Sequence, residues 1–331
     1  MSSTAPEGST PTGPASGPSL TPYFFILFGM SAGLASIIVL LAELRDQLGF
    51  SETGIGLAVG SGFGAAFVAC LVMAPHADRG RAPAMLRAGL ALAVAGMVLL
   101  AVGQELWHYV AGRIVFGFAL GTAGPAARRT VIVADPANLG RNIGRLGAWD
   151  VGGFVAGPMI AAGLTAVGGF RFTFWTMAGA LSLLLPVAFR AQPDVAAQDQ
   201  ERLGLRGLLR IRRLIGAFFM VAAYFVFIGA FEAVWILEMD TRGASRAVLG
   251  VALTVGALPI ALLSPLGGIL AQRYGARRWA IGSLGIITLM VIFWGIVPGV
   301  VGLIALTVAT SVVEGFGFPS TPMLVAAAVP E

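Results

Sequence analysis

Long apolar stretches follow one another along this chain, with only short polar connections between them. Each is about 17–25 residues long, the length at which an α-helix crosses the apolar core of a bilayer, which is about 30 Å thick. Hydrophobic residues make up 57% of the sequence and charged residues only 11%, too few to cover a water-facing surface. Backbone groups inside lipid must hydrogen-bond within their own segment, so such stretches are helices. The sequence therefore predicts an all-α membrane protein.

Ten apolar spans are predicted, and a polar linker divides them into six and four. They run near residues 22–42, 53–74, 84–103, 109–129, 149–168, 172–190, 214–238, 248–271, 279–297 and 300–324. Residues 1–20 are mostly Ser, Thr, Pro and Gly, a composition typical of a disordered tail. We therefore expect a first half at 21–190, a basic cytoplasmic linker at 191–213 and a four-helix second half at 214–331.

The arginines predict the orientation of the chain. All 21 basic residues are arginines. If the N-terminus is cytoplasmic, sixteen of them lie in or beside cytoplasmic loops, four lie on the other side, and Arg113 lies within a span. Cytoplasmic loops carry such an excess of basic residues, so both termini are expected to be cytoplasmic in a plasma (inner) membrane protein. The same clustering in alternate loops argues against nucleic-acid binding.

Two short loops rich in arginine and glycine occur at equivalent places in the two halves. The offset between them is 194 residues, measured from Arg79 to Arg273. Internal repetition of helical halves is characteristic of secondary transporters. Both loops are predicted to control the change between inward- and outward-facing states. The residues concerned are Asp78, Arg79, Gly80 and Arg81 in the first loop and Gly268, Gln272, Arg273, Gly275 and Arg277 in the second.

Both loops resemble a loop of the major facilitator superfamily. That loop usually runs Gly-x-Leu-Ala-Asp-Arg-x-Gly and is followed by basic residues. The first copy departs from it by having Ala74 for the leading Gly, His76 for the Leu and one residue fewer before Gly80. The second copy keeps the spacing and has Gln272 in place of the acid. The resemblance implies a helical bundle with pseudo-symmetric halves and a substrate between them.

Spans four to six extend this resemblance. Span four carries an Arg-x-x-x-Gly pattern beginning at Arg113, and span six opens with an aromatic-Arg pair at Phe170. Span five carries Gly153, Gly157 and Pro158, similar to the Gly-x-x-x-Gly-Pro motif of the family's proton antiporters. Glycines four residues apart let helices approach closely, and a proline bends a helix. The alternative interpretation of this helix-packing motif is a general packing face of small residues.

Three charged residues inside spans are candidates for proton coupling: Arg113, Glu232 and Glu314. An ionised side chain in the apolar core of a membrane is costly and usually functional. For Arg113 the alternative is a side chain that reaches the nearby surface, and for Glu232 an ordinary hydrogen bond in the bundle. Asp150, which would head span five, is interpreted instead as an acid at a helix N-terminus, favoured by the helix dipole.

No enzyme site is predicted. A phosphate-binding P-loop needs a Lys, and the chain has none. Metal binding is not expected either, because the chain has only two His and one Cys. We therefore expect a secondary active transporter of a small solute, in the lipid bilayer, that works by alternating access with proton-coupled efflux. It needs no cofactor beyond a proton gradient. The alternatives are a nutrient uniporter or symporter, and a non-transporting remnant or receptor. The sequence predicts neither the substrate nor the oligomeric state.

The chain is also expected to be two helices short of the architecture that it resembles. Adding the offset of 194 residues to Pro158 places the counterpart of span five near position 352, beyond Glu331. The sequence is accordingly expected to be either a fragment or a truncated form.

Overall fold

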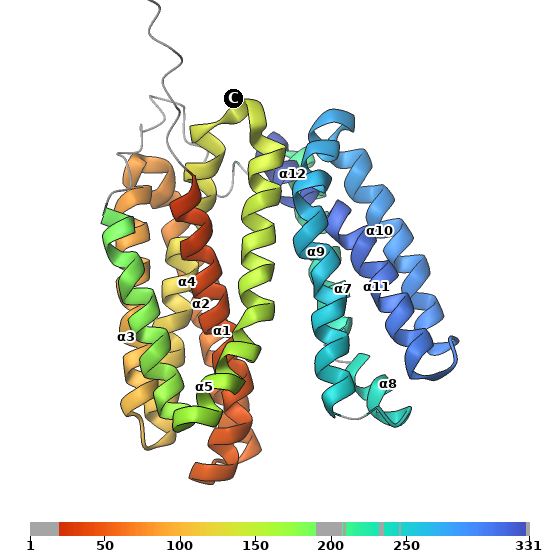
Figure 1. Cartoon of the computed structure of the whole chain (residues 1–331). Helices are drawn as coiled ribbons and strands as arrows, with labels where there is room; N and C mark the ends of the chain where they lie inside the picture. Colours follow the sequence, from red (N-terminus) through yellow and green to blue (C-terminus); the bar gives the residue numbers. More distant parts are fainter. Residues whose placement is uncertain (1–19, 190–206, 208–209, 232–234, 245, 329–331) are drawn as a thin grey trace, which may run out of the picture.

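The computed structural model describes residues 20–189, 207, 210–231, 235–244 and 246–328, and within these ranges all regular elements are helical. Figure 1 shows two bundles of helices side by side. The first contains α1 (Thr21–Leu48), α2 (Glu52–His76), α3 (Ala82–Val102), α4 (Leu106–Ala134) and α5 (Leu139–Phe189). The second contains α7 (Arg212–Ala230), α8 (Ile236–Thr241), α9 (Arg246–Tyr274), α10 (Ala276–Ile292), α11 (Gly299–Gly317) and α12 (Ser320–Ala328).

Six stretches of the described chain are long and apolar enough to cross a membrane. Two of them, Thr53–Val102 with 50 residues and Pro136–Phe189 with 54, each contain a bend and exceed a single crossing. A shorter apolar helix covers Thr21–Ile37. The all-helical membrane fold predicted from the sequence is confirmed, whereas the number of ten crossings stays a prediction.

Glycines with positive φ make the tight turns in the two equivalent loops. The turn η1 (Ala77–Arg81) joins α2 to α3, and Gly80 within it has a φ of 74°. Gly275 joins α9 to α10 with a φ of 96°. Residues other than glycine rarely adopt this conformation. Inside α5 the chain turns again at Gly169, which separates a first arm from a second.

One predicted span boundary was wrong. Span five was placed at 149–168, but α5 begins at Leu139, because a polar first turn can still be helical when it packs against another helix. The span predicted at 300–324 agrees with the apolar stretch Gly299–Val325, which contains α11, ending at Gly317, and most of α12, beginning at Ser320. The span predicted at 214–238 overlaps α7 (Arg212–Ala230), and residues 232–234 of it lie outside the described residues.

We call one end of the molecule the arginine-rich end. It holds η1, the turn η2 (Pro136–Asn138) between α4 and α5, and the Gly275 turn. Contacts between these turns and neighbouring helices place them together: Arg129 pairs with Asp78, and Gln272 bonds to Ala137. The opposite end holds the α3–α4 turn, Gly169 and the α10–α11 turn.

Candidate functional site

The two halves contact each other along α5 and α9 at the arginine-rich end (Figure 1). Gly140 lies against the backbone of Gly268, and Gly144 lies against the carbonyl of Ser264. A Cβ atom added at either position on α5 would overlap backbone atoms of α9. This close approach of the halves therefore depends on residues without a side chain.

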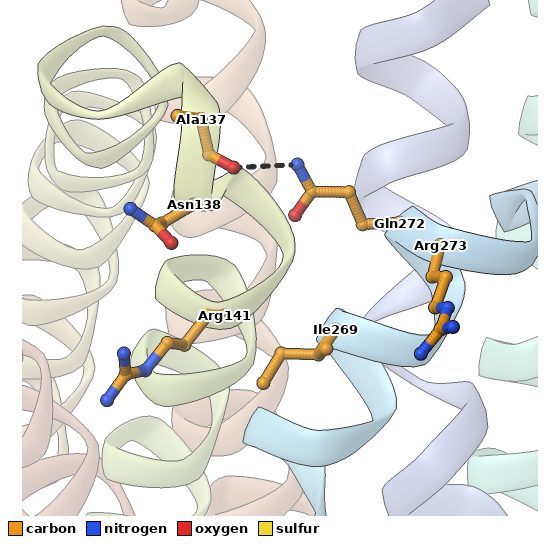
Figure 2. Close-up of a pocket in the computed structure, with 6 residues that line it drawn as sticks. All are labelled: Ala137, Asn138, Arg141, Ile269, Gln272 and Arg273. Atoms are coloured by element: carbon orange, nitrogen blue, oxygen red, sulfur yellow. Dashed lines mark hydrogen bonds between the residues drawn. The ribbon is translucent and has the colours of Figure 1, made fainter.

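Gln272 joins the halves at the same end. Its side-chain oxygen accepts a hydrogen bond from the Gly140 N–H at 2.8 Å, and its side-chain nitrogen donates to the Ala137 carbonyl at 3.1 Å (Figure 2). The Gly140 N–H belongs to the first turn of α5, where backbone donors lack partners within the helix. Beside this contact is an open hollow of about 350 Å³, lined from both halves by Ala137, Asn138, Arg141, Ile269, Gln272 and Arg273.

The substitution Gln272→Ala is expected to loosen this contact. It removes two hydrogen bonds, each worth about 0.5–1.5 kcal/mol, so the equilibrium should shift roughly tenfold or more toward separated halves. A Ser264→Cys reporter, buried in the interface, should then react faster with a maleimide in a Cys70→Ser background. Arg273→Ala, which removes a neighbouring side chain but neither of these bonds, is the matched control, and equal acceleration by both variants would contradict the prediction.

Beyond Gly144 the packing between the halves becomes looser. Gly147 lies on the same face of α5 as Gly140, because seven residues make about two helical turns. A Cβ atom at Gly147 would nevertheless meet no atom within 4 Å. Figure 1 likewise shows the two bundles closer together at the arginine-rich end than at the opposite end. The tightest packing between the halves thus lies at the arginine-rich end.

A polar cluster lies just past this point, and the sequence interpretation missed it. Asp150 on α5 accepts a hydrogen bond from the Ser31 hydroxyl of α1, and the Arg128 guanidinium of α4 lies 4.0 Å from its carboxylate. Asp150 follows Leu139 by eleven residues, or about 16 Å of helix, so its interpretation as a helix N-terminal acid was wrong. The Asp135–Pro136 pair was the signal for the true helix start.

Arg113 is buried in the first half. Its side chain is 1% exposed and donates to the carbonyls of Ala58 at 3.2 Å and Val59 at 3.3 Å on α2. Its guanidinium also lies 5.7 Å from the centre of the Phe63 ring. Gly62 makes room for the arginine, because a Cβ atom there would lie 2.9 Å from the guanidinium. Arg113 thus joins α4 to α2, and no carboxylate pairs with it among the described residues.

Glu314 is buried in the second half, in a different place from Arg113. It lies on α11 and interacts electrostatically with the Tyr224 hydroxyl of α7, which hydrogen-bonds Ser283 of α10 at 2.5 Å. Within the part of the chain that the structure describes, the Glu314 carboxyl has no hydrogen-bond or ion-pair partner. The third candidate, Glu232, lies outside the described residues.

Most of the predicted loop residues lie at the surface of the arginine-rich end, whereas Gly268 is buried against α5. Asp78 forms an ion pair of 3.0 Å with Arg129. Arg79, Arg81 and Arg277 are exposed. The first loop therefore contacts its own half, whereas Gly268 and Gln272, at the end of α9, contact the other half.

The glycine motif of span five packs against α1. Gly153 lies against the backbone of Phe28, and Gly157 lies against the carbonyl of Ala32. The hydroxyl of Ser36 donates to the Gly157 carbonyl at 2.9 Å, next to Pro158. The first arm of α5 thus contacts α1 through these glycines and α9 through Gly140 and Gly144.

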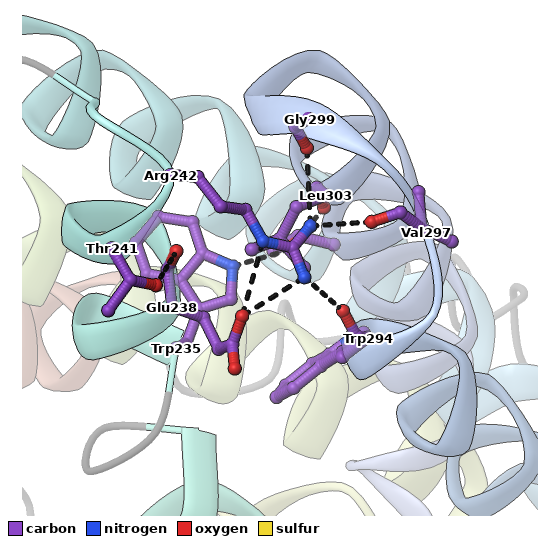
Figure 3. Close-up of polar contacts among 9 residues, drawn as sticks. Trp235, Glu238, Thr241, Arg242, Trp294, Val297, Gly299 and Leu303 are labelled. Carbon is purple, nitrogen blue, oxygen red and sulfur yellow. Dashed lines mark hydrogen bonds and ion pairs between the residues drawn. The ribbon is translucent and has the colours of Figure 1, made fainter.

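In the second half, an arginine links α8 to the α10–α11 turn at the end opposite to the arginine-rich end. Arg242 pairs with Glu238 at 3.0 Å and donates to three backbone carbonyls of the α10–α11 turn (Figure 3). The distances are 2.6 Å to Trp294, 2.6 Å to Val297 and 3.2 Å to Gly299. This arginine has its donors occupied within its own half, so it is a structural contact.

Two membrane-embedded helical bundles that meet at one end, with polar groups between them, define a class of membrane transport protein. Sequence comparison gives the family: the model of the Major Facilitator Superfamily matches residues 23–236 and 213–331. The chain belongs to the major facilitator superfamily, a family of membrane transporters. The resemblance seen in the sequence is confirmed.

Curated relatives and a solved structure agree with this assignment. The multidrug resistance protein MdtG of Proteus mirabilis is 25% identical over 319 residues, covering 91% of this chain and 79% of the relative. MdtH of Yersinia pestis is 28% identical over 292 residues, covering 82% and 69%. The human organic anion transporter MFSD10 has a similar fold, with a TM-score of 0.70 at 16% identity over 94% of this chain and 86% of that one.

Proposed function

We propose that this protein is a secondary active transporter that exports a small organic solute in exchange for protons by alternating access. The observation that carries the proposal is the one-sided interface. Gly140, Gly144 and Gln272 hold the halves together at the arginine-rich end, and the packing is looser at Gly147, where an added Cβ atom would meet no other atom within 4 Å. A transporter of this kind exposes a site between its halves to one side of the membrane at a time.

The arginine distribution supports an orientation for this state. If the arginine-rich end is cytoplasmic, as the excess of basic residues favours, the described conformation opens to the outside. Both described ends of the chain, at α1 and α12, then belong to the cytoplasmic side of an inner membrane. The two relatives are named as multidrug resistance proteins, which supports export and an organic substrate.

Glu314 is the proposed proton-coupling group of the second half, together with Glu232. The support for Glu314 is a buried carboxyl without an ion-pair partner among the described residues. We expect Glu314→Gln to lower pH-driven flux by roughly tenfold or more, the contribution typical of a positioned acid or base, and to leave substrate exchange at equal pH largely intact. Ser311→Ala, one turn earlier on α11, is the control. Normal pH-driven flux in the Gln variant would make Glu314 structural.

The proposed function is tested by flux in liposomes that contain the purified chain, with an imposed pH gradient and a panel of cationic, neutral and anionic compounds. Export driven by an opposing proton gradient is the expected result. Flux in the same direction as protons would indicate a symporter. Flux that does not depend on the pH gradient would indicate a uniporter. The absence of flux for every compound would contradict transport by this chain.

A further inference from the structure

The buried carboxyl of Glu314 lies beside a pair of hydroxyl groups in the second half. The side-chain oxygens of Tyr224 on α7 and Ser283 on α10 are 2.5 Å apart, and both side chains are buried. The Tyr224 hydroxyl also interacts electrostatically with Glu314 on α11. Three helices thus bring two hydroxyls and a carboxyl together inside the bundle.

Gly317 provides the room for this hydroxyl pair next to Glu314. It follows Glu314 by three residues, and residues three apart lie on the same face of a helix. A Cβ atom added at Gly317 would overlap the hydroxyl oxygens of both Tyr224 and Ser283. Both hydroxyls therefore pack against the face of α11 that carries Glu314, at a position where any residue larger than glycine would displace them.

The hydrogen bond between the two hydroxyls can run in either direction. The Ser283 hydroxyl lies 3.1 Å from the carbonyl oxygen of Ala280 on the same helix and donates to it. In that arrangement the Ser283 oxygen accepts the Tyr224 proton, and the Tyr224 oxygen is left as an acceptor. In the reverse arrangement Ser283 donates to Tyr224, whose own proton is then free for another acceptor. Both arrangements keep the bond between the hydroxyls, because each hydroxyl can donate and accept.

The two arrangements match the two charge states of Glu314. A protonated carboxyl is a donor and needs an acceptor, which the Tyr224 oxygen supplies in the first arrangement. An ionised carboxylate only accepts and needs a donor, which the Tyr224 hydroxyl supplies in the reverse arrangement. A buried carboxylate that lacks such a donor is costly. Reorientation of two hydroxyls therefore serves either charge state without a change in the fold.

Tyr224 is the titratable group beside Glu314 in the part of the chain that the structure describes. On α8, Glu238 is paired with Arg242 at the opposite end of the bundle, and α12 carries no titratable residue. The described titratable side chains of the other helices near Glu314 lie in their first or last turns, are exposed, and form no hydrogen bond or ion pair with Glu314. They are Arg212 and Arg213 on α7, Arg273 and Tyr274 on α9, and Arg277 and Arg278 on α10.

We propose that Tyr224 and Ser283 form a reversible hydrogen-bond chain that positions Glu314 and stabilises it in both charge states. The inference rests on the proposed function, in which Glu314 binds and releases the coupled proton, and it assigns two positioning residues to that group. When Glu314 takes up a proton from water, its O–H donates to the Tyr224 oxygen. Tyr224 then donates to Ser283, which donates to the Ala280 carbonyl. When the proton is released to water, the chain reverses and Tyr224 donates to the carboxylate. The O–H bond of Glu314 is the one covalent bond that forms and breaks.

The chain is tested without transport by infrared spectroscopy, which detects the carbonyl stretch of a protonated carboxyl group. In a pH titration of the purified chain, Glu314→Gln should remove one such band. Tyr224→Phe removes the donor to the carboxylate and should raise the pH midpoint of that band by roughly one to two pH units. Tyr109→Phe, which removes a buried hydroxyl that donates to the Gly103 carbonyl in the first half, is the matched control and should leave the midpoint in place. An unchanged midpoint in Tyr224→Phe, or no band lost in Glu314→Gln, would overturn the proposal.

A second variant tests the arrangement while both hydroxyls are present. Gly317→Ala should displace the hydroxyl pair and move the midpoint in the same direction as Tyr224→Phe. Gly285→Ala on α10, where an added Cβ atom meets nothing within 4 Å, is the control for the glycine substitution. A midpoint that Gly317→Ala leaves in place would show that the hydroxyls do not serve the carboxyl.

The link to transport is tested in liposomes with the same variants. The pH profile of driven flux should move in Tyr224→Phe by as much as the midpoint of the band, and Tyr109→Phe should keep the profile of the wild type. A shifted band with an unshifted flux profile would refute the role of the chain in coupling. If Tyr224→Phe shifts the Glu314 band but the wild type transports no compound, the proposed function fails while the hydrogen-bond chain stands.

Discussion

Replacing Gly144 by valine is expected to abolish transport. The new side chain would overlap the Ser264 carbonyl of the other half, where even a Cβ atom has no room. Overpacking of this kind costs about 1–3 kcal/mol, which lowers the population of the closed interface roughly tenfold or more. A carrier that cannot close at this end cannot complete an alternating cycle. The measurement is flux in liposomes, combined with maleimide labelling of an Ala271→Cys reporter buried near the interface.

Gly147→Val is the matched control for this prediction. It places the same side chain on the same face of the same helix, one turn further on, where no atom lies within 4 Å of the added Cβ. Both variants carry the same helix-propensity change, so a difference between them reports the contact with α9. Equal flux in the two variants would show that the α5–α9 contact is not part of the cycle.

A second large effect is expected inside the first half. Gly157→Val would press against the Ala32 carbonyl and the Ala35 side chain of α1, and the overpacking should lower the free energy of unfolding by about 1–3 kcal/mol. Gly163→Val, six residues later on the same arm, meets no atom within 4 Å and should cost much less. Thermal unfolding in detergent compares the two. A similar loss of stability in both variants would mean that the glycine motif is not a tight contact.

The helical spans could be predicted because a run of apolar residues is a local signal that is as long as the bilayer is thick. The two equivalent turns could also be predicted from the local sequence, because Gly80 and Gly275 lie within short basic loops. The start of α5 was not predicted, because Arg141 and Arg145 lower the apolar character of a segment that is nevertheless helical and packs on α9. A hydropathy pattern does not detect a polar helical turn that is stabilised by packing against another helix.

The polar groups of the site were harder to predict for a related reason. Ser31, Arg128 and Asp150 come from three helices, and their separations of up to 119 residues carry no pattern. The sequence singled out Arg113 as a charge within a span, but its partners are backbone carbonyls of α2, which have no signature in the sequence. Likewise, the hydroxyls of Tyr224 and Ser283 near Glu314 come together only in the folded second half.

The central claim is that the two ends of the interface open and close in alternation. The most direct test is a pair of distance measurements between spin labels in liposomes, in a Cys70→Ser background. One pair, Val133→Cys with Arg278→Cys, reports the arginine-rich end, and the other, Trp107→Cys with Val301→Cys, reports the opposite end; all four side chains are exposed. On changing from mildly alkaline to mildly acidic pH with a transported compound present, one distance should lengthen while the other shortens. Two distances that stay fixed, or that change in the same direction, would contradict the account.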